Sequence, residues 1–265
     1  MSPAATRRPA GSSGRGARKP PAATAVPPPP PPRRRRANTA GPLVGLAIAL
    51  AGGGLAQLDS ADHITRSRDV QPSAVTAAVD ELLGQLEVAP ESQAVYSRAK
   101  FRHWSDLDQD GCNTREEVLI AEKRDGRTED CRVIDGSWFS TYDGITVTDP
   151  GDLDIDHVVA LGEAWDSGAD QWNDDDGDRR QRYANDLGYR NSLIAVTATT
   201  NRQKGDKDPT DWIPSRKAAW CRYATAWTTV KIRWGLTADP DEIAALRTLF
   251  AQCRTAPPTT VTPAA

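Results

Sequence analysis

The side chains best suited to chemistry stand in two short segments of this 265-residue chain. Asp154, Asp156 and His157 interrupt an apolar, β-branched stretch, and a mostly buried strand has no structural use for three such groups. Asn201 lies 44 residues after His157, and Lys204 follows three residues later. An imidazole can act as a general base, and carboxylate and amide oxygens are hard ligands for Mg²⁺, Mn²⁺ or Ca²⁺. The set predicts a base beside a single metal ion, which indicates phosphodiester hydrolysis.

Particular elements are needed to bring the two segments together. The apolar residues around Ile155 and Val158 predict one strand, and residues 192–196 predict a second. The hydroxyls of residues 197–200 offer N-caps for a brief helix that Gly205 can end. The amide and the ammonium, three residues apart, would share one face of that helix. Two strands and a helix would therefore gather the imidazole, the carboxylate and the amide around one point.

These motifs resemble those of a known enzyme family. Asp156-His157, a later Asn191 before a strand, and Asn-Arg-Gln-Lys-Gly at 201–205 are similar to the HNH (ββα-metal) nucleases, in the variant whose last His is Asn. Over residues 80–254 the chain resembles secreted actinobacterial HNH-family proteins related to the C-terminal nuclease domain of GmrSD-type restriction enzymes. Ala160 stands where the family usually has a proline.

The resemblance implies a role for each matching residue. His157 corresponds to the general base, and Asp156 and Asn201 correspond to ligands of a catalytic Mg²⁺ or Mn²⁺. Asn191 corresponds to the central Asn that braces the His loop, and Lys204 falls where a family lysine approaches the phosphate. The implied reaction is attack of a water, deprotonated by neutral imidazole, on phosphorus.

From these features we expect an α+β fold, with a ββα-metal (HNH) core embedded in a mainly helical, disulfide-stabilised single domain. The expected partner is a nucleic acid substrate, DNA before RNA, and the expected state is a monomer. Two other classes stay open. One is a calcium-stabilised extracellular binding or cell-wall module with an inactive nuclease core, and the other is a different metal-dependent phosphodiesterase.

A second metal motif lies upstream. Asp106, Asp108, Asp110, Gly111 and Glu117 match the EF-hand loop at every liganding carboxylate and at the turn glycine. The pattern predicts a structural Ca²⁺ site. The alternative is an Asp-rich turn whose carboxylates are solvated.

The beginning of the chain is predicted to be a leader. Residues 1–56 hold nine Lys or Arg and no acid, with a proline run at 27–32, so they cannot build a core. The apolar segment at 42–55 is about 14 residues long, whereas a membrane span needs about 20. We expect a secretory signal cut near Ala56, an extracellular protein and no stable membrane association after processing. An uncleaved anchor is the alternative.

The domain boundaries follow from the same composition. We predict the leader at 1–56, a linker at 57–75, a nuclease domain at 76–254 and a disordered Thr/Pro tail at 255–265. Without the leader, 24 of the 33 Lys and Arg remain against all 36 acids, so the formal charge becomes about −12. That charge is opposite to the charge of a general nucleic-acid binder.

Cysteines and helix patterns complete the prediction. In an exported chain the four cysteines favour two disulfides, with three connectivities open: Cys112, Cys131, Cys221 and Cys253. Residues 215–233 predict a helix whose aromatic stripe belongs to the core, and Asp239 caps a second helix. Glu163 is expected to be solvated.

Overall fold

The computed structural model describes residues 75–77, 79–173, 178–253 and 259–264. The predicted leader and nearly all of the predicted linker lie outside these residues, as do residues 174–177. The described residues mix helices with four small antiparallel two-stranded sheets. They all belong to one compact unit of the chain.

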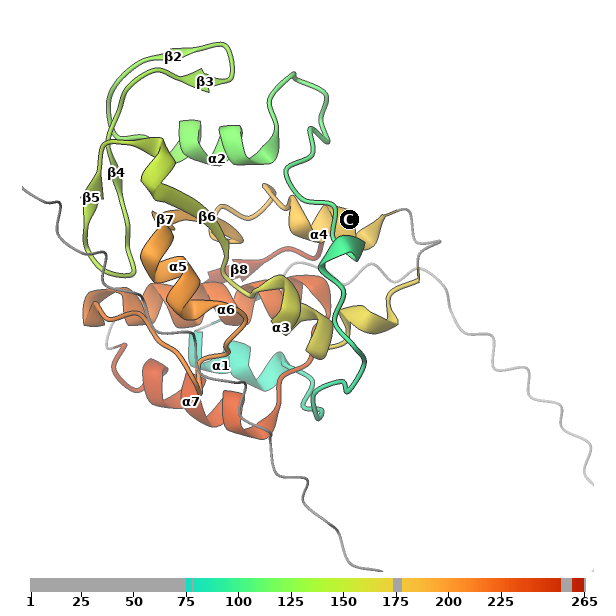
Figure 1. Ribbon diagram of the computed structural model, residues 1–265. Helices are drawn as coiled ribbons and strands as arrows, with labels where there is room; N and C mark the ends of the chain where they lie inside the picture. Colours follow the sequence, from blue (N-terminus) through green and yellow to red (C-terminus); the bar gives the residue numbers. More distant parts are fainter. Residues whose placement is uncertain (1–74, 78, 174–177, 254–258, 265) are drawn as a thin grey trace, which may run out of the picture. The chain divides into compact units, whose positions relative to one another are not determined.

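The predicted strand, returning strand and brief helix are present. Strand β6 (Leu153–His157) pairs antiparallel with β7 (Leu193–Thr197), so that His157 lies opposite Leu193. Helix α5 (Ala198–Lys204) follows β7 directly and packs against both strands (Figure 1). Gly205 ends the helix with a positive φ of 59°, a conformation that glycine adopts at little cost.

The start of α5 differs from the prediction. The Thr197 side chain does not cap the helix, because its hydroxyl donates to the Asp143 carboxylate. The Thr200 hydroxyl donates to the same carboxylate over 2.7 Å. Asp143 comes from the hairpin of β4 (Trp138–Phe139) and β5 (Thr146–Val147), so a distant loop holds the beginning of α5 in place.

Helix α2 (Thr114–Glu122) covers one face of the β6–β7 pair. Its Val118 and Leu119 pack with side chains from both strands in a buried cluster. Asn113 caps α2 and forms a reciprocal capping box with Glu116. The β2–β3 hairpin (Thr128–Glu129 and Arg132–Val133) contacts α2 next.

The remaining helices enclose a larger core. They are α1 (Val79–Leu82), α3 (Leu161–Asp166), α4 (Arg179–Ala184), α6 (Trp220–Trp234) and α7 (Pro240–Phe250). The aromatic stripe of α6 is buried as predicted, with Trp227 and Tyr223 inside the core. Asp239 caps α7 as predicted, since its carboxylate accepts from the amides of Asp241 and Glu242. Across the described residues, we find no helix with the length and apolar character needed to span a bilayer.

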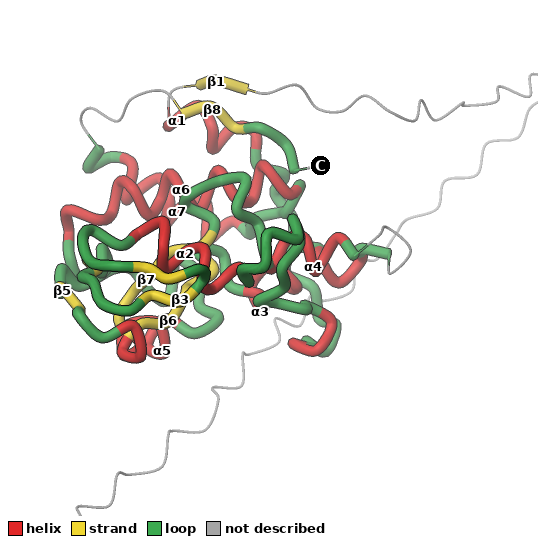
Figure 2. Tube along the Cα trace, turned by 90° about the horizontal axis from the view of Figure 1, so that it is seen from above, coloured by secondary structure: helices red, strands yellow, loops and turns green. Residues whose placement is uncertain are grey.

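The described part of the predicted Thr/Pro tail, residues 259–264, contacts the rest of the domain. Strand β8 (Thr259–Val261) pairs antiparallel with β1 (Val75–Ala77) (Figure 2). Val261 is buried, and the amide of Ala264 donates to the Arg233 carbonyl of α6. Backbone pairing and one buried valine thus order a segment whose Thr/Pro composition is typical of disorder.

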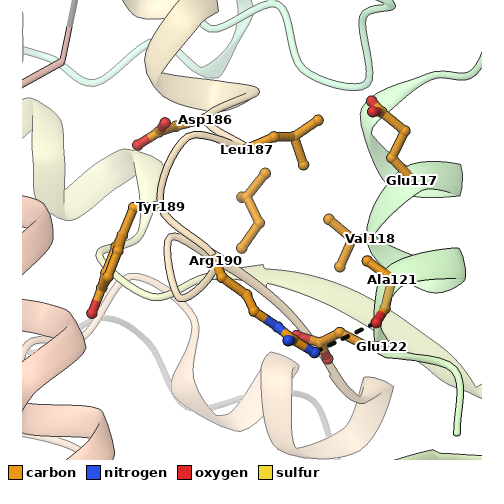
Figure 3. A pocket seen from close by; sticks show the side chains of 9 residues that line it. Glu117, Val118, Ala121, Glu122, Asp186, Leu187, Tyr189 and Arg190 are labelled. Carbon is orange, nitrogen blue, oxygen red and sulfur yellow. Dashed lines mark hydrogen bonds between the residues drawn. The ribbon is translucent and has the colours of Figure 1, made fainter. Parts of the chain in front are cut away.

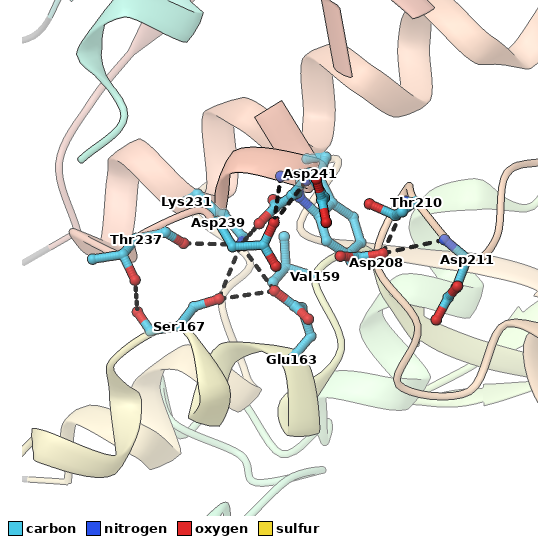
Figure 4. A network of polar contacts seen from close by, with 12 residues as sticks. Val159, Glu163, Ser167, Asp208, Thr210, Asp211, Lys231, Thr237, Asp239 and Asp241 are labelled. Atoms are coloured by element: carbon cyan, nitrogen blue, oxygen red, sulfur yellow. Dashed lines mark hydrogen bonds and ion pairs between the residues drawn. The ribbon is translucent and has the colours of Figure 1, made fainter. Parts of the chain in front are cut away.

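Two disulfides and a buried ionic network tie the elements together. The disulfides join Cys112 to Cys131 and Cys221 to Cys253, which is one of the three connectivities that the sequence leaves open. In the network, the Lys231 ammonium of α6 contacts Glu163 of α3 and Glu242 of α7 (Figure 4). Glu163 is therefore buried in an ion pair, and the prediction of a solvated carboxylate is wrong.

Candidate functional site

A cavity of about 360 Å³ lies beside β6 and α5. His157, Asp156 and Asn201, which are far apart in the sequence, line this one cavity. Arg98, Arg202 and Tyr96 are among the other residues that line it. The fold thus brings the imidazole, one carboxylate and the amide of the two motif segments to a common space.

The His157 ring is held tightly. Its Nε2 lies 2.9 Å from the carbonyl oxygen of Ala184, and since a carbonyl can only accept, Nε2 carries the proton. Nδ1 is therefore the basic nitrogen of the neutral ring. The Trp104 ring lies against the imidazole, with centroids 5.6 Å apart and planes 30° from parallel. Burial lowers the pKa of His157 to about 3, helped by the charges of Lys204 and Arg98, so the ring is neutral at pH 7.

Asp156 and Lys204 form a buried ion pair. The Lys204 ammonium lies 2.8 Å from Asp156 Oδ1 and also donates to the His157 carbonyl over 2.9 Å. The Tyr142 hydroxyl donates to the other oxygen, Oδ2, over 2.7 Å. Burial raises the pKa of Asp156, while Lys204 and Tyr142 oppose that effect. Lys204 has no exposed surface, so in this arrangement its ammonium reaches Asp156 and not the solvent.

Asn201 lies next to a second carboxylate, that of Asp154. The Asn201 Nδ2 group is 3.3 Å from Asp154 Oδ2, and Arg202 Nε is 3.7 Å from the same oxygen. Asp154 and Asp156 stand two positions apart on β6 and therefore point to the same face of the strand, the face that α5 covers. Hard oxygen donors thus gather where α5 crosses β6.

Asn191 lies elsewhere. Its amide donates to the Tyr189 hydroxyl and its oxygen accepts from Arg222, and it does not line the cavity beside β6. The backbone group that contacts the His157 ring belongs to Ala184. The next residue, Asn185, is buried and bonded through both ends of its amide to Ser105, Thr114, Arg102 and Gln181.

Two residues near His157 were missed from sequence, Trp104 and Arg98. Trp104 has a positive φ of 58°, which is rare for a bulky side chain and places its ring on the imidazole. Arg98 reaches the cavity from a short 3₁₀ helix, Arg98–Lys100, far from either motif. The sequence contains no periodic or motif signal for either contact.

The predicted calcium-binding carboxylates are close together. Oxygens of Asp106, Asp108 and Asp110 lie within 4.8 Å of one another, in an exposed loop before α2. Gly111 has a φ of 99°, and its amide donates to Asp106. Burial and the three aspartates raise the pKa of Glu117, which places this carboxyl in their field.

A second cavity, of about 310 Å³, lies between α2 and the loop at 186–190 (Figure 3). Its apolar walls include Val118 and Leu187, and two of its charged side chains, Glu122 and Arg190, are hydrogen-bonded to the backbone. Glu122 accepts from the Ala195 amide of β7, and Arg190 donates to the Ala121 carbonyl. This cavity contains none of the residues predicted to be catalytic.

Comparison with known proteins identifies a family and a relative of this chain. The model of the family described as GmrSD restriction endonucleases, C-terminal domain, matches residues 98–249, more than half of the chain. An uncharacterized secreted protein of the fungus Arthroderma benhamiae is 44% identical over 187 residues, covering 69% of this chain and 87% of that protein. This relative is fungal, whereas the resemblance noted in the sequence is to secreted actinobacterial proteins. No solved structure matches the chain.

The matched region contains β6, β7, α5 and every residue that lines the described cavity except Tyr96. The chain therefore belongs to the family of the C-terminal domain of GmrSD restriction endonucleases, a nuclease family.

Proposed function

We propose that this protein is an HNH-type endonuclease that hydrolyses phosphodiester bonds of DNA, with RNA as the second candidate substrate. The proposal rests on one observation: His157, Asp156 and Asn201 line a single cavity at a β-strand, β-strand, α-helix unit. Membership of a nuclease family supports the same conclusion.

His157 would act as the general base. With Nε2–H donated to the Ala184 carbonyl, Nδ1 is the nitrogen that would take the proton from an attacking water. The Trp104 ring and the Ala184 carbonyl fix the plane of the imidazole before substrate binds. Asn185, rather than Asn191, would brace the segment that carries this carbonyl.

The oxygen donors fit a divalent metal ion. Each Asp156 oxygen accepts one hydrogen bond and keeps a second lone pair, and the Asn201 amide oxygen and the half-buried Asp154 carboxylate lie nearby. Such hard ligands suit Mg²⁺ or Mn²⁺, which keep several waters. When bound, the ion would supply positive charge to the phosphate and the departing oxygen. Lys204 would hold Asp156 in its orientation.

The Asp-rich loop would bind a second, structural ion. Asp106, Asp108, Asp110 and Glu117 have the EF-hand spacing, and the disulfide at Cys112 anchors the loop. We propose Ca²⁺ there, because calcium is available outside cells. An extracellular site of action fits the two disulfides and the relative described as secreted.

Plasmid cleavage by the purified protein tests the proposal. We expect no cleavage in EDTA and cleavage in Mg²⁺ or Mn²⁺. Asn201→Ala should raise the metal concentration needed for half-maximal cleavage, whereas Gln203→Ala, an exposed neighbour on α5, should not. Cleavage in EDTA equal to that in Mg²⁺ would contradict the metal-dependent mechanism.

A further inference from the structure

An anionic substrate in the cavity beside β6 needs an accessible cation, and the lysine of the motif does not supply it. Lys204, the lysine that matches the family pattern, is fully buried against Asp156. Of the cationic side chains in the described chain, Arg98 and Arg202 are the ones that line this cavity, and both are exposed. They come from separate elements, the 3₁₀ helix at 98–100 and α5.

Arg98 is attached to the core through a histidine. Arg98 Nη2 lies 3.4 Å from His103 Nε2, and His103 Nδ1 lies 3.1 Å from the carbonyl of Phe101, a fully buried core residue. Because that carbonyl can only accept, Nδ1 carries the proton and Nε2 accepts from Arg98. The contact uses one of the five N–H donors of the guanidinium. His103 thus orients Arg98 without neutralising its charge.

The surroundings of Arg98 favour an anionic ligand. Its charge is close enough to His157 to help lower the pKa of that ring. Arg202 contributes a second guanidinium to the cavity, with its Nε 3.7 Å from an Asp154 oxygen. The lining also contains one exposed carboxylate, that of Asp206. A planar guanidinium matches the geometry of a phosphate and can bind it through two hydrogen bonds.

We propose that Arg98, oriented by His103, binds a backbone phosphate that neighbours the bond to be cleaved, and that Arg202 binds a second one. This inference rests on the proposed nuclease function. It assigns recognition of a nucleic acid strand to Arg98, which lies outside both motif segments, and to Arg202, to which the resemblance assigns no role. The predicted mature form of the chain is acidic, so these two guanidiniums would supply the local positive charge that attracts the phosphates of the substrate.

Binding of a fluorescein-labelled DNA duplex to the His157→Ala protein in Mg²⁺, between 50 and 200 mM KCl, tests this. Over a range of about 50–200 mM salt, the affinity of a protein that contacts phosphates changes strongly, so the number of contacts can be measured from the slope. In that background, Arg98→Ala should weaken binding about tenfold and reduce the slope of log K against log[KCl] by about 0.9. Arg202→Ala should do the same. Arg98→Lys should keep the salt slope but lose part of the affinity. The control is Arg247→Ala, an exposed arginine on α7, which contributes no residue to the cavity.

A small substrate separates the neighbouring phosphate from the reacting one. Bis-p-nitrophenyl phosphate has a single phosphate, so Arg98→Ala should lower kcat/KM for an oligonucleotide about tenfold more than it lowers kcat/KM for this small substrate. An Arg98→Ala protein that binds DNA with the same affinity and salt slope as Arg247→Ala would overturn the inference. Equal losses on both substrates would overturn the assignment to a neighbouring phosphate. If the wild type cleaves neither substrate but Arg98 still controls DNA binding, the proposed function fails and the binding role stands.

Discussion

At the scale of single residues, Asp156 and Lys204 depend on each other. Both side chains are buried, and the charge of each is compensated by the opposite charge of the other. Taking the ammonium away would leave the Asp156 carboxylate in the protein interior, hydrogen-bonded to the Tyr142 hydroxyl but with its charge uncompensated. Breaking a buried ion pair in this way is costly because the charge that stays behind is no longer compensated.

Lys204→Met should therefore destabilise the protein by about 3–5 kcal/mol in urea unfolding at pH 7. Adding Asp156→Asn should recover part of that loss, because the pair is then removed together. Lys207→Met is the matched control, since Lys207 is exposed and bonds to backbone carbonyls at the end of α5. Unchanged stability with strongly weakened DNA binding would instead show that Lys204 contacts the phosphate.

Residue chemistry could be predicted from sequence where a motif carries it, as for His157 and Asn201, which reach the same cavity. Partners that arrive from distant segments could not be predicted. Trp104 approaches His157 through an unusual backbone angle, and Glu163 becomes buried because Lys231 comes from a helix about 70 residues later. Neither contact can be recognised from the residues next to it in the sequence.

At the scale of elements, the β6–β7–α5 unit could be predicted because apolar periodicity and a stop glycine are local signals. The N-cap of α5 could not, because Asp143 of the β4–β5 hairpin takes the threonine hydroxyls. Order in residues 259–264 also depends on partners far away, β1 and Arg233.

The Asp-rich loop before α2 is expected to bind Ca²⁺ and so to stabilise the folded protein. If Asp106, Asp108, Asp110 and Glu117 bind Ca²⁺, the ion stabilises the folded state by mass action, by about 1.4 kcal/mol at ten times its Kd. The thermal midpoint should rise by about 3–5 °C between EGTA and millimolar Ca²⁺. A variant with all three aspartates changed to Asn should show no rise. An equal rise in that variant would place the ion elsewhere, and no rise in the wild type would leave a plain Asp-rich turn.

At the scale of the whole molecule, the network around Lys231 joins helices that are distant in sequence. Its ammonium contacts Glu163 of α3, Glu242 of α7 and the Thr237 carbonyl. The Trp227 indole donates to the other oxygen of Glu242. Two buried carboxylates share one lysine, so one negative charge is poorly compensated. Burial, with Glu163 adding to the effect, raises the pKa of Glu242 to about 7.

This shift makes stability depend on pH in a known direction. The ordinary pKa of a glutamate is 4.5, so the unfolded chain loses this proton at a lower pH than the folded protein does. The carboxyl's contribution is complete below about pH 4.5 and is lost as the pH rises through 7. Glu242→Gln cannot ionise and should be less destabilising at pH 8 than at pH 5, by about 2–3 kcal/mol. Urea unfolding at both pH values measures this.

The exposed Glu87→Gln serves as the control and should show no such difference. The titration of His157 is present in every one of these proteins and cancels in the comparison. A Glu242→Gln protein with the same relative stability at both pH values would mean that Glu242 stays ionised throughout this range.

The central claim is that His157 removes a proton from water during phosphodiester hydrolysis. Single-turnover cleavage of an end-labelled DNA duplex in saturating Mg²⁺, by wild type and by His157→Ala of equal thermal stability, tests it most directly. The account predicts a rate about 10²–10⁴ times lower for the variant, with the same Mg²⁺ affinity. A variant that cleaves as fast as the wild type would contradict it.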